Sequence, residues 1–320
     1  MQNILDNYAA STGLHINYTK SSLIPINISN DRALTIATLL DCKIGVMPFT
    51  YLGLPVGTTK PTVQDMMPLV DRVERKMSAN VMMMAYSGRV TVINSLITSI
   101  AMFSMCSLEI PPKILEHLEK IRKHILWDKK TEDGVKTNYL VAWDRVCMPK
   151  KRGGIGVLNL KIQNEALLLK FLDKFYNKVD TPWVTLVWNA YYTEKVPHAI
   201  DPCGSFWWRS VLKLCPIFRG IAKCSVGNGN SVLFWKDNWT DKPASDIYLR
   251  AFSFCKDEDI SVRKFLGANT LAENFNLPLS PEAMAEVRSL QQDSLSLTLQ
   301  SNDKDEWIYP WGNHYTSSKY

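Results

Sequence analysis

The chain has 320 residues, of which 46% are hydrophobic and 21% are charged, and its formal net charge is +6. This composition is typical of a globular protein and excludes a low-complexity or intrinsically disordered chain. A single hydrophobic core rarely grows beyond roughly 250 to 300 residues, so two domains or subdomains are expected. The mild positive charge is compatible with a phosphate-rich partner, but many proteins that bind no nucleic acid share it.

Cysteine usage and the amino terminus bear on the cellular compartment. Seven cysteines are scattered singly, without the Cys-x-x-Cys pair that often begins a zinc site, and the five histidines are isolated. The first residues lack the basic and apolar regions of a signal peptide. The longest apolar run, 90–105, is interrupted by polar residues and is shorter than the roughly 20 residues of a membrane span. We therefore expect reduced thiols, no metal site, no membrane span, and a nuclear or cytoplasmic protein.

Residues 1–61 predict a short α+β segment. Residues 2–12 are typical of the tail of a helix that ends at Gly13, and 30–42 place apolar residues at helical spacing. The runs 15–18 and 23–26 predict two short strands, and 49–56 predicts a third. Because the chain starts within an element, a truncated domain is expected.

Residues 62–127 predict three successive helices, with Thr62 and Ser87 as candidate N-caps. The last helix, 113–127, carries isoleucines and leucines on one face, so one stripe should be buried and the lysines solvated. Residues 129–158 are rich in lysine, arginine and glycine, which indicates a connecting segment.

Residues 159–320 predict a mostly helical domain. Asn159 is a candidate N-cap for a helix that ends near Tyr176, and more helices are predicted at 183–192, 205–214, 244–255, 260–267 and 281–299. The segment 222–239 has two β-type runs around a Gly-Asn-Gly turn and predicts a hairpin, and 305–320 is strand-like. The predicted fold class is therefore α+β and predominantly helical.

Four stretches, in a fixed order along nearly the whole chain, resemble one protein family. They are STGLHINYTKS at 11–21, YLGLP at 51–55, SGRVTVINS at 87–95 followed by Leu126-Trp127, Trp143 and PKKRGGIGVLNL at 149–160, and VGNGNSVLFWKDNW at 226–239. On these residues the chain resembles the carboxy-terminal part of the reverse transcriptases of plant LINE-type non-LTR retrotransposons. The matching part of that family runs from the end of the palm through the thumb toward the reverse transcriptase zinc-binding domain.

The resemblance implies four parts. Residues 1–61 would be a truncated palm remnant, 62–128 a helical thumb-like bundle, and 129–158 a basic glycine-rich connector. Residues 159–320 would be a mostly helical domain that contains the hairpin 222–239 and ends at the start of a zinc-binding-like segment.

The family is an RNA-directed DNA polymerase, and the resemblance implies a catalytic site that this chain lacks. Family members hold Mg²⁺ with carboxylates, two of them in a Tyr/Phe-x-Asp-Asp turn upstream of the stretch that matches 11–21. The present sequence contains no Asp-Asp pair. We therefore expect no polymerase activity and no cofactor for this chain alone.

Two parts of the resemblance concern the polymerase active site of that family. Lys20 matches a lysine thought to protonate the pyrophosphate leaving group, a role that would be vestigial here, and the alternative is a solvated lysine. Tyr51, Leu52 and Gly53 match the strand that helps to hold the primer end, and the alternative is an ordinary buried strand.

Basic residues supply the candidates for nucleic-acid binding. In the thumb-like part and just after it the candidates are Lys113, Lys120, Arg122, Lys123, Lys129 and Lys130, and before a Gly-Gly pair they are Lys150, Lys151 and Arg152. A charged helix face is often merely solvated, so that alternative stays open. Gly227-Asn-Gly229 lacks the lysine of a phosphate loop and is interpreted as a turn, and the ten tryptophans as mainly core residues.

Three hypotheses for function follow. The chain is a non-catalytic remnant that binds RNA or an RNA–DNA duplex weakly, a helical protein-interaction module without a nucleic-acid role, or a chain that completes a polymerase palm in trans.

Overall fold

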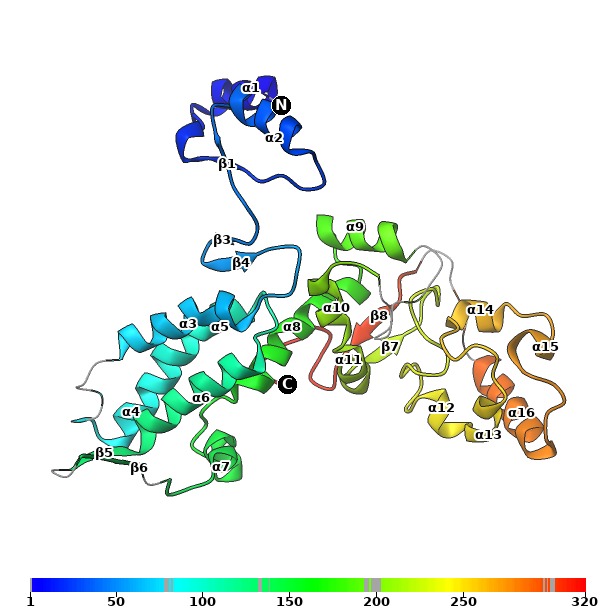
Figure 1. The fold of residues 1–320 in the computed structure, drawn as a ribbon. Coiled ribbons are helices and arrows are strands. Elements are labelled where there is room, and N and C mark those ends of the chain that lie inside the picture. The colour runs from blue at the N-terminus through cyan, green and yellow to red at the C-terminus, as the bar shows by residue number, and fades with distance from the viewer. Residues whose placement is uncertain are drawn as a thin grey trace. The chain divides into compact units, whose positions relative to one another are not determined.

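The computed structural model describes residues 2–77, 81, 83–131, 134–137, 139–192, 196, 203–295, 297, 299 and 303–320. The chain forms two compact units, Met1–Met67 and Pro68–Tyr320, and each is treated by itself below. Figure 1 shows many short helices and small two-stranded sheets. The predicted class, α+β and predominantly helical, is confirmed.

The first unit contains two helices and four short strands. The helices are α1 (Gln2–Thr12) and α2 (Asn30–Leu39), with a 3₁₀ turn, η1 (Tyr18–Lys20), between them. The strands pair as β1 (Ser22–Leu23) with β2 (Lys43–Ile44), parallel, and as β3 (Phe49–Tyr51) with β4 (Leu54–Val56), antiparallel. Both predicted helices are thus confirmed, and the second ends three residues earlier than expected.

Two strand predictions in this unit are wrong. Residues 15–18 form no strand, because the Asn17 side chain accepts the Lys20 backbone N–H at 3.1 Å and starts the 3₁₀ turn. Residues 49–56 form a hairpin instead of one strand. Leu52 and Gly53 at its tip have φ of 49° and 80°, and such paired positive values suit a tight two-residue turn.

Three helical runs follow, as predicted for 62–127. They are α3 (Val63–Lys76), then α4 (Tyr86–Val92) continued by a π-helical turn η3 (Ile93–Ile97) and α5 (Thr98–Met105), and finally α6 (Pro112–Trp127). Thr62 caps α3, because its hydroxyl accepts the Asp65 N–H at 3.3 Å while the Asp65 carboxylate accepts the Thr62 N–H at 2.8 Å. Ser87 is not a cap, since the N-cap of α4 is Ala85.

The continuous helix Tyr86–Met105 is long and apolar enough, by length and composition alone, to cross a membrane. The buried core helix of a soluble protein passes the same test. Here Ile93, Ile97, Ala101 and Met105 are at most 1% exposed, and the helix packs against α6 and α8. This packing is that of a core helix.

The predicted connector 129–158 contains more structure than expected. Its backbone forms β5 (Asp128–Thr131) paired with β6 (Gly134–Thr137), then α7 (Trp143–Cys147) and a 3₁₀ turn, η4 (Lys150–Arg152). The following helix, α8 (Leu160–Tyr176), begins where predicted. The Asn159 side chain caps it by accepting the backbone N–H groups of Lys161 and Ile162.

The rest of the chain is mostly helical, as predicted. The longer helices are α9 (Pro182–Tyr191), α10 (Phe206–Leu212), α11 (Cys215–Ile221) and α16 (Pro281–Leu295), and the shorter ones are α12 (Ala244–Ile247), α13 (Leu249–Ser253), α14 (Val262–Leu266) and α15 (Leu271–Asn274). Of these, α11 and α15 were not predicted.

The predicted hairpin at 222–239 is wrong. β7 (Lys223–Ser225) pairs antiparallel with β8 (Glu306–Ile308), about eighty residues further along the chain, and residues 226–239 form an irregular loop. Of the strand-like stretch 305–320, only β8 is a named strand.

An aromatic core holds this part of the second unit together. Phe175 of α8 stacks on Trp188 of α9 at 4.6 Å between ring centroids, and Tyr176 stacks on Phe218 of α11 at 5.1 Å. Trp208, Trp235 and Trp239 are at most 7% exposed. The prediction that these tryptophans are core residues is confirmed.

Candidate nucleic-acid interface

The guanidinium of Arg122 lies inside the protein and not on the surface of α6. Its side chain is fully buried, and it donates to the Glu119 carboxylate at 2.9 Å and to the Leu158 carbonyl at 2.7 Å. Burial lowers the pKa of Arg122, and the Glu119 charge opposes that shift. The prediction that Arg122 contacts phosphate is therefore wrong. Its guanidinium N–H groups are used inside the protein, where they link α6 to the segment just before α8.

The same carboxylate gathers the residues around α7. Glu119 also accepts the indole N–H of Trp143 at 2.7 Å and the Leu160 backbone N–H at 3.3 Å. The Arg122 guanidinium and the Lys123 ammonium each lie 5.7 Å from the centre of the Trp143 ring. These contacts join Trp143 and the segment 158–160 to α6.

Burial raises the pKa of the Cys147 thiol, at the end of α7, to about 11. Alkylation requires the thiolate, so its rate in the native protein should rise about tenfold per pH unit up to about pH 11. In the urea-unfolded chain the rate should level off near the ordinary thiol pKa of about 8.5. Mass spectrometry of iodoacetamide-treated protein measures both profiles, and identical profiles would contradict the partial burial of the Cys147 thiol.

The three lysines of α6 differ in their exposure and in the charges around them. Lys113 and Lys120 are exposed and Lys123 is half-buried. Lys120 and Lys123 line a groove of about 690 Å³ between α6, α7, α8 and α10, together with Lys161, Lys213, Glu109, Glu116, Glu119, Asp144 and Glu165. Five carboxylates among four lysines do not make a track for a phosphate backbone. Lys129 and Lys130 lie in β5, but their side chains are outside the described residues.

The three cations at 150–152 lie together on a tightly constrained turn, which we call the basic turn (Lys150–Arg152, η4). All three side chains are exposed. Gly153 ends the turn with φ of 82°, and its N–H donates to the Lys150 carbonyl at 3.1 Å. A methyl group on Gly154 would lie 1.9 Å from the Met148 carbonyl oxygen, so only glycine fits there. Within the described part of the chain, none of these three side chains has a hydrogen-bond or ion-pair partner.

The two stretches predicted to match a polymerase active site, Lys20 and Tyr51-Leu52-Gly53, lie in the first unit. Lys20 ends the 3₁₀ turn η1 and is exposed. Tyr51 and Leu52 are 61% and 73% exposed at the tip of the β3–β4 hairpin, so the alternative of an ordinary buried strand is wrong. The vestigial leaving-group role of Lys20 and the primer-grip-like role of residues 51–53 stay predictions.

Arg89, in the stretch 87–95, was not singled out from the sequence and has a structural role. It is 7% exposed and its guanidinium donates to the backbone carbonyls of Ile125, Leu126 and Asp128, the last at 2.6 Å. These carbonyls have no partner within α6, because they belong to its end. A side chain from α4 thus caps α6.

The stretch 226–239 is also a folding element and not a phosphate loop. The buried carboxylate of Asp305, just before β8, accepts the backbone N–H groups of Gly227 and Gly229 at 2.9 and 2.8 Å. It also accepts the N–H and hydroxyl of Ser231, at 3.0 and 2.6 Å. Gly227-Asn-Gly229 is thus not the turn of the predicted hairpin but part of a loop that a distant segment closes.

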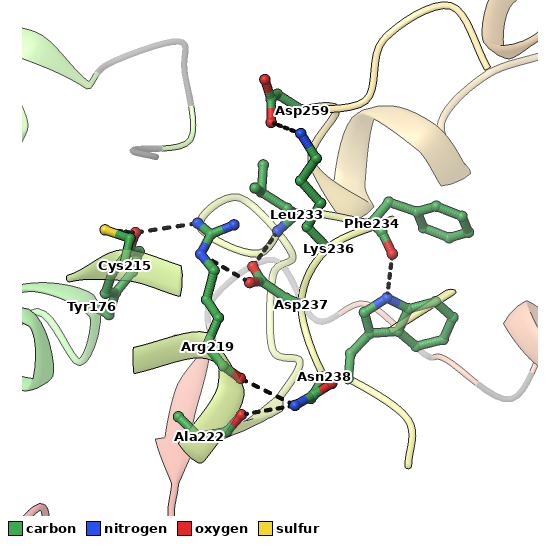
Figure 2. A network of polar contacts seen from close by, with 11 residues as sticks. Tyr176, Cys215, Arg219, Ala222, Leu233, Phe234, Lys236, Asp237, Asn238 and Asp259 are labelled. Atoms are coloured by element: carbon green, nitrogen blue, oxygen red, sulfur yellow. Dashed lines mark hydrogen bonds and ion pairs between the residues drawn. The ribbon is translucent and has the colours of Figure 1, made fainter. Parts of the chain in front are cut away.

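Figure 2 shows a second buried polar network in the same stretch. Asp237 accepts the Leu233 N–H at 2.6 Å, and its other oxygen lies 3.2 Å from Arg219 Nε of α11. Arg219 also donates to the Tyr176 hydroxyl at 3.2 Å, and Asn238 donates to the carbonyls of Arg219 and Ala222. The carboxylate of Asp237 in this stretch thus pairs inside the protein, whereas Lys236 pairs with Glu258 and Asp259 near the surface.

Among the residues that the structure describes, no group of three or more His, Cys, Asp or Glu side chains could hold a metal ion.

The chain shares sequence similarity with a plant protein. No family model matches the chain. Over 186 residues the chain is 28% identical to a protein of Arabidopsis thaliana with the name "Putative ribonuclease H protein At1g65750". The aligned part is 56% of this chain and 30% of that protein, so the chain spans less than a third of its relative's length. In sequence, therefore, the chain is similar to part of a plant protein named for ribonuclease H.

Proposed function

We propose that this chain binds the phosphate backbone of a nucleic acid and does not catalyse a reaction on it. The basic turn makes the contact. The observation that carries the proposal is the display of Lys150, Lys151 and Arg152 side by side on a turn that glycine geometry fixes. Three adjacent, exposed cations without carboxylate partners are the arrangement that attracts phosphates and releases their counterions. The relative's name, a nucleic-acid enzyme, is in keeping with such a partner.

The finer part of the proposal concerns origin and activity. The four motif stretches support descent from a plant LINE-type reverse transcriptase, and their charged and aromatic residues in the second unit hold the scaffold together. The sequence lacks an Asp-Asp pair, and among the described residues no three carboxylate, histidine or cysteine side chains are placed to hold a metal ion. We therefore propose that this chain alone neither polymerises nor hydrolyses nucleic acid.

The test is the salt dependence of binding to an RNA–DNA duplex, measured by fluorescence anisotropy. Each phosphate contact contributes about 0.9 to the slope of log K against log salt for B-form duplexes. Replacing Lys150, Lys151 and Arg152 with alanine should therefore lower that slope by about 2 to 3 and weaken binding at low salt at least about tenfold.

A matched control separates the basic turn from net charge. Lys242, Arg250 and Arg288 are also exposed, and their replacement with alanine likewise removes three positive charges. This control should keep most of the wild-type slope. Equal effects of the two triple variants, or no binding of the wild type at low salt, would reject the proposal and favour a protein-interaction role.

A further inference from the structure

A hollow of about 520 Å³ is bounded by the carboxyl end of α8, by α9 and by residue 304. Its walls combine two lysines, Lys178 and Lys304, with the indole of Trp188 and the polar side chains of Thr185 and Asn189. One carboxylate, Asp180, is exposed and also lines the hollow. The volume falls within the range of small-molecule sites, roughly 300 to 1,000 Å³.

Lys178 occupies a backbone position that favours glycine. Its φ is 45°, and the hydrogen bonds from Lys178 N to Phe175 O and from Val179 N to Lys174 O close the end of α8. A residue after a helix with this pattern is usually glycine, because a side chain is disfavoured in the left-handed region. The chain holds a lysine there in spite of that conformational cost, and such strain is often found at functional positions.

Lys178 lies beside an aromatic ring and near charges of both signs. Its ammonium lies 4.6 Å from the centre of the Trp188 ring, and that indole donates to the Phe175 carbonyl at 2.9 Å. Burial lowers the pKa of Lys178, Asp305 opposes that shift, and the like charge of Lys304 adds to it. Since the Asp305 oxygens already accept four donors from 227–231, a bound anion would relieve the repulsion between the lysines.

We propose that this hollow binds a nucleoside phosphate. Lys178 and Lys304 pair with the phosphate, Thr185 and Asn189 supply hydrogen bonds, and the base lies beside the partly exposed indole of Trp188, one face of which Phe175 covers. The ligand is either a free nucleotide or the phosphorylated end of a single strand, which share this chemistry. The inference shares no residue with the basic turn and does not depend on it.

Equilibrium dialysis of the full chain with AMP at low ionic strength tests the site. Lys178→Gly removes the charge and relieves the backbone strain, so AMP binding should weaken at least about tenfold while the melting temperature changes by no more than about 3 °C. Lys304→Ala, at an exposed position, should weaken binding to a similar extent. Asp180→Asn should tighten it about two- to threefold, because a repelling charge is removed.

Controls define the ligand class and its source. Lys242→Ala, an exposed lysine elsewhere, should leave AMP binding unchanged. AMP should bind more tightly than inorganic phosphate or adenosine, and a comparison with a 5′-phosphorylated dinucleotide distinguishes a free nucleotide from a strand end. No AMP binding at millimolar concentration, equal affinity for phosphate, or full binding by both lysine variants would overturn the inference.

Discussion

Replacing Asp305 with alanine should lower the free energy of unfolding of the second unit by about 3 to 5 kcal/mol. The side chain is 4% exposed and accepts three backbone N–H groups and one hydroxyl from 227–231. Without it these donors stay buried without a partner, because the loop is too tightly packed to turn them outward. A methyl group at Gly227 would lie 2.5 Å from the Lys304 carbonyl oxygen.

Urea unfolding followed by tryptophan fluorescence measures this change. All ten tryptophans lie between residues 127 and 311, so the signal reports on the second unit alone. Asp303→Ala, two residues away at an exposed position, should change the free energy by less than about 0.5 kcal/mol. Equal stabilities of the two alanine variants would contradict the role of Asp305 as the centre of the loop.

The sequence allowed correct predictions where the interacting groups lie close together along the chain, and not where they lie far apart. Thr62 and Asn159 were predicted as caps because the groups they accept are two or three residues away. The hairpin at 222–239 was wrong because the partner of β7 is β8, and nothing near 222–239 indicates that pairing. The hydrogen-bond acceptor that closes Gly227-Asn-Gly229 is likewise 76 to 78 residues away.

Distant partners also decide which basic residues are buried and which are exposed, and the sequence near each residue does not indicate these partners. Arg122 and the exposed lysines of α6 look alike in sequence, yet Arg122 donates to a carbonyl 36 residues away and is buried. Arg89 likewise reaches carbonyls 36 to 39 residues away. One local signal was informative. The glycines at 153, 154 and 156 predicted a connecting segment, and the three cations beside them are all exposed.

Replacing Arg219 with methionine should lower the free energy of unfolding by about 3 to 5 kcal/mol at neutral pH, because it leaves the Asp237 carboxylate buried without its cation. Asp237 is 0% exposed, and the ion pair with Arg219 Nε is 3.2 Å long. The double variant with Asp237→Asn keeps an oxygen for the Leu233 N–H and removes the orphaned charge. It should therefore recover at least about 2 kcal/mol of the loss.

The pH dependence of the single variant gives an independent check. Burial raises the pKa of Asp237 and the Arg219 charge lowers it, so loss of the arginine raises that pKa further. A raised native pKa means that the folded state binds the proton more tightly than the unfolded state, whose Asp pKa is about 3.9. The stability of Arg219→Met should consequently rise relative to wild type as the pH falls from 7 toward 4. A deficit that is constant over this range, or a double variant no more stable than Arg219→Met, would show that lost packing and not the orphaned carboxylate causes the effect.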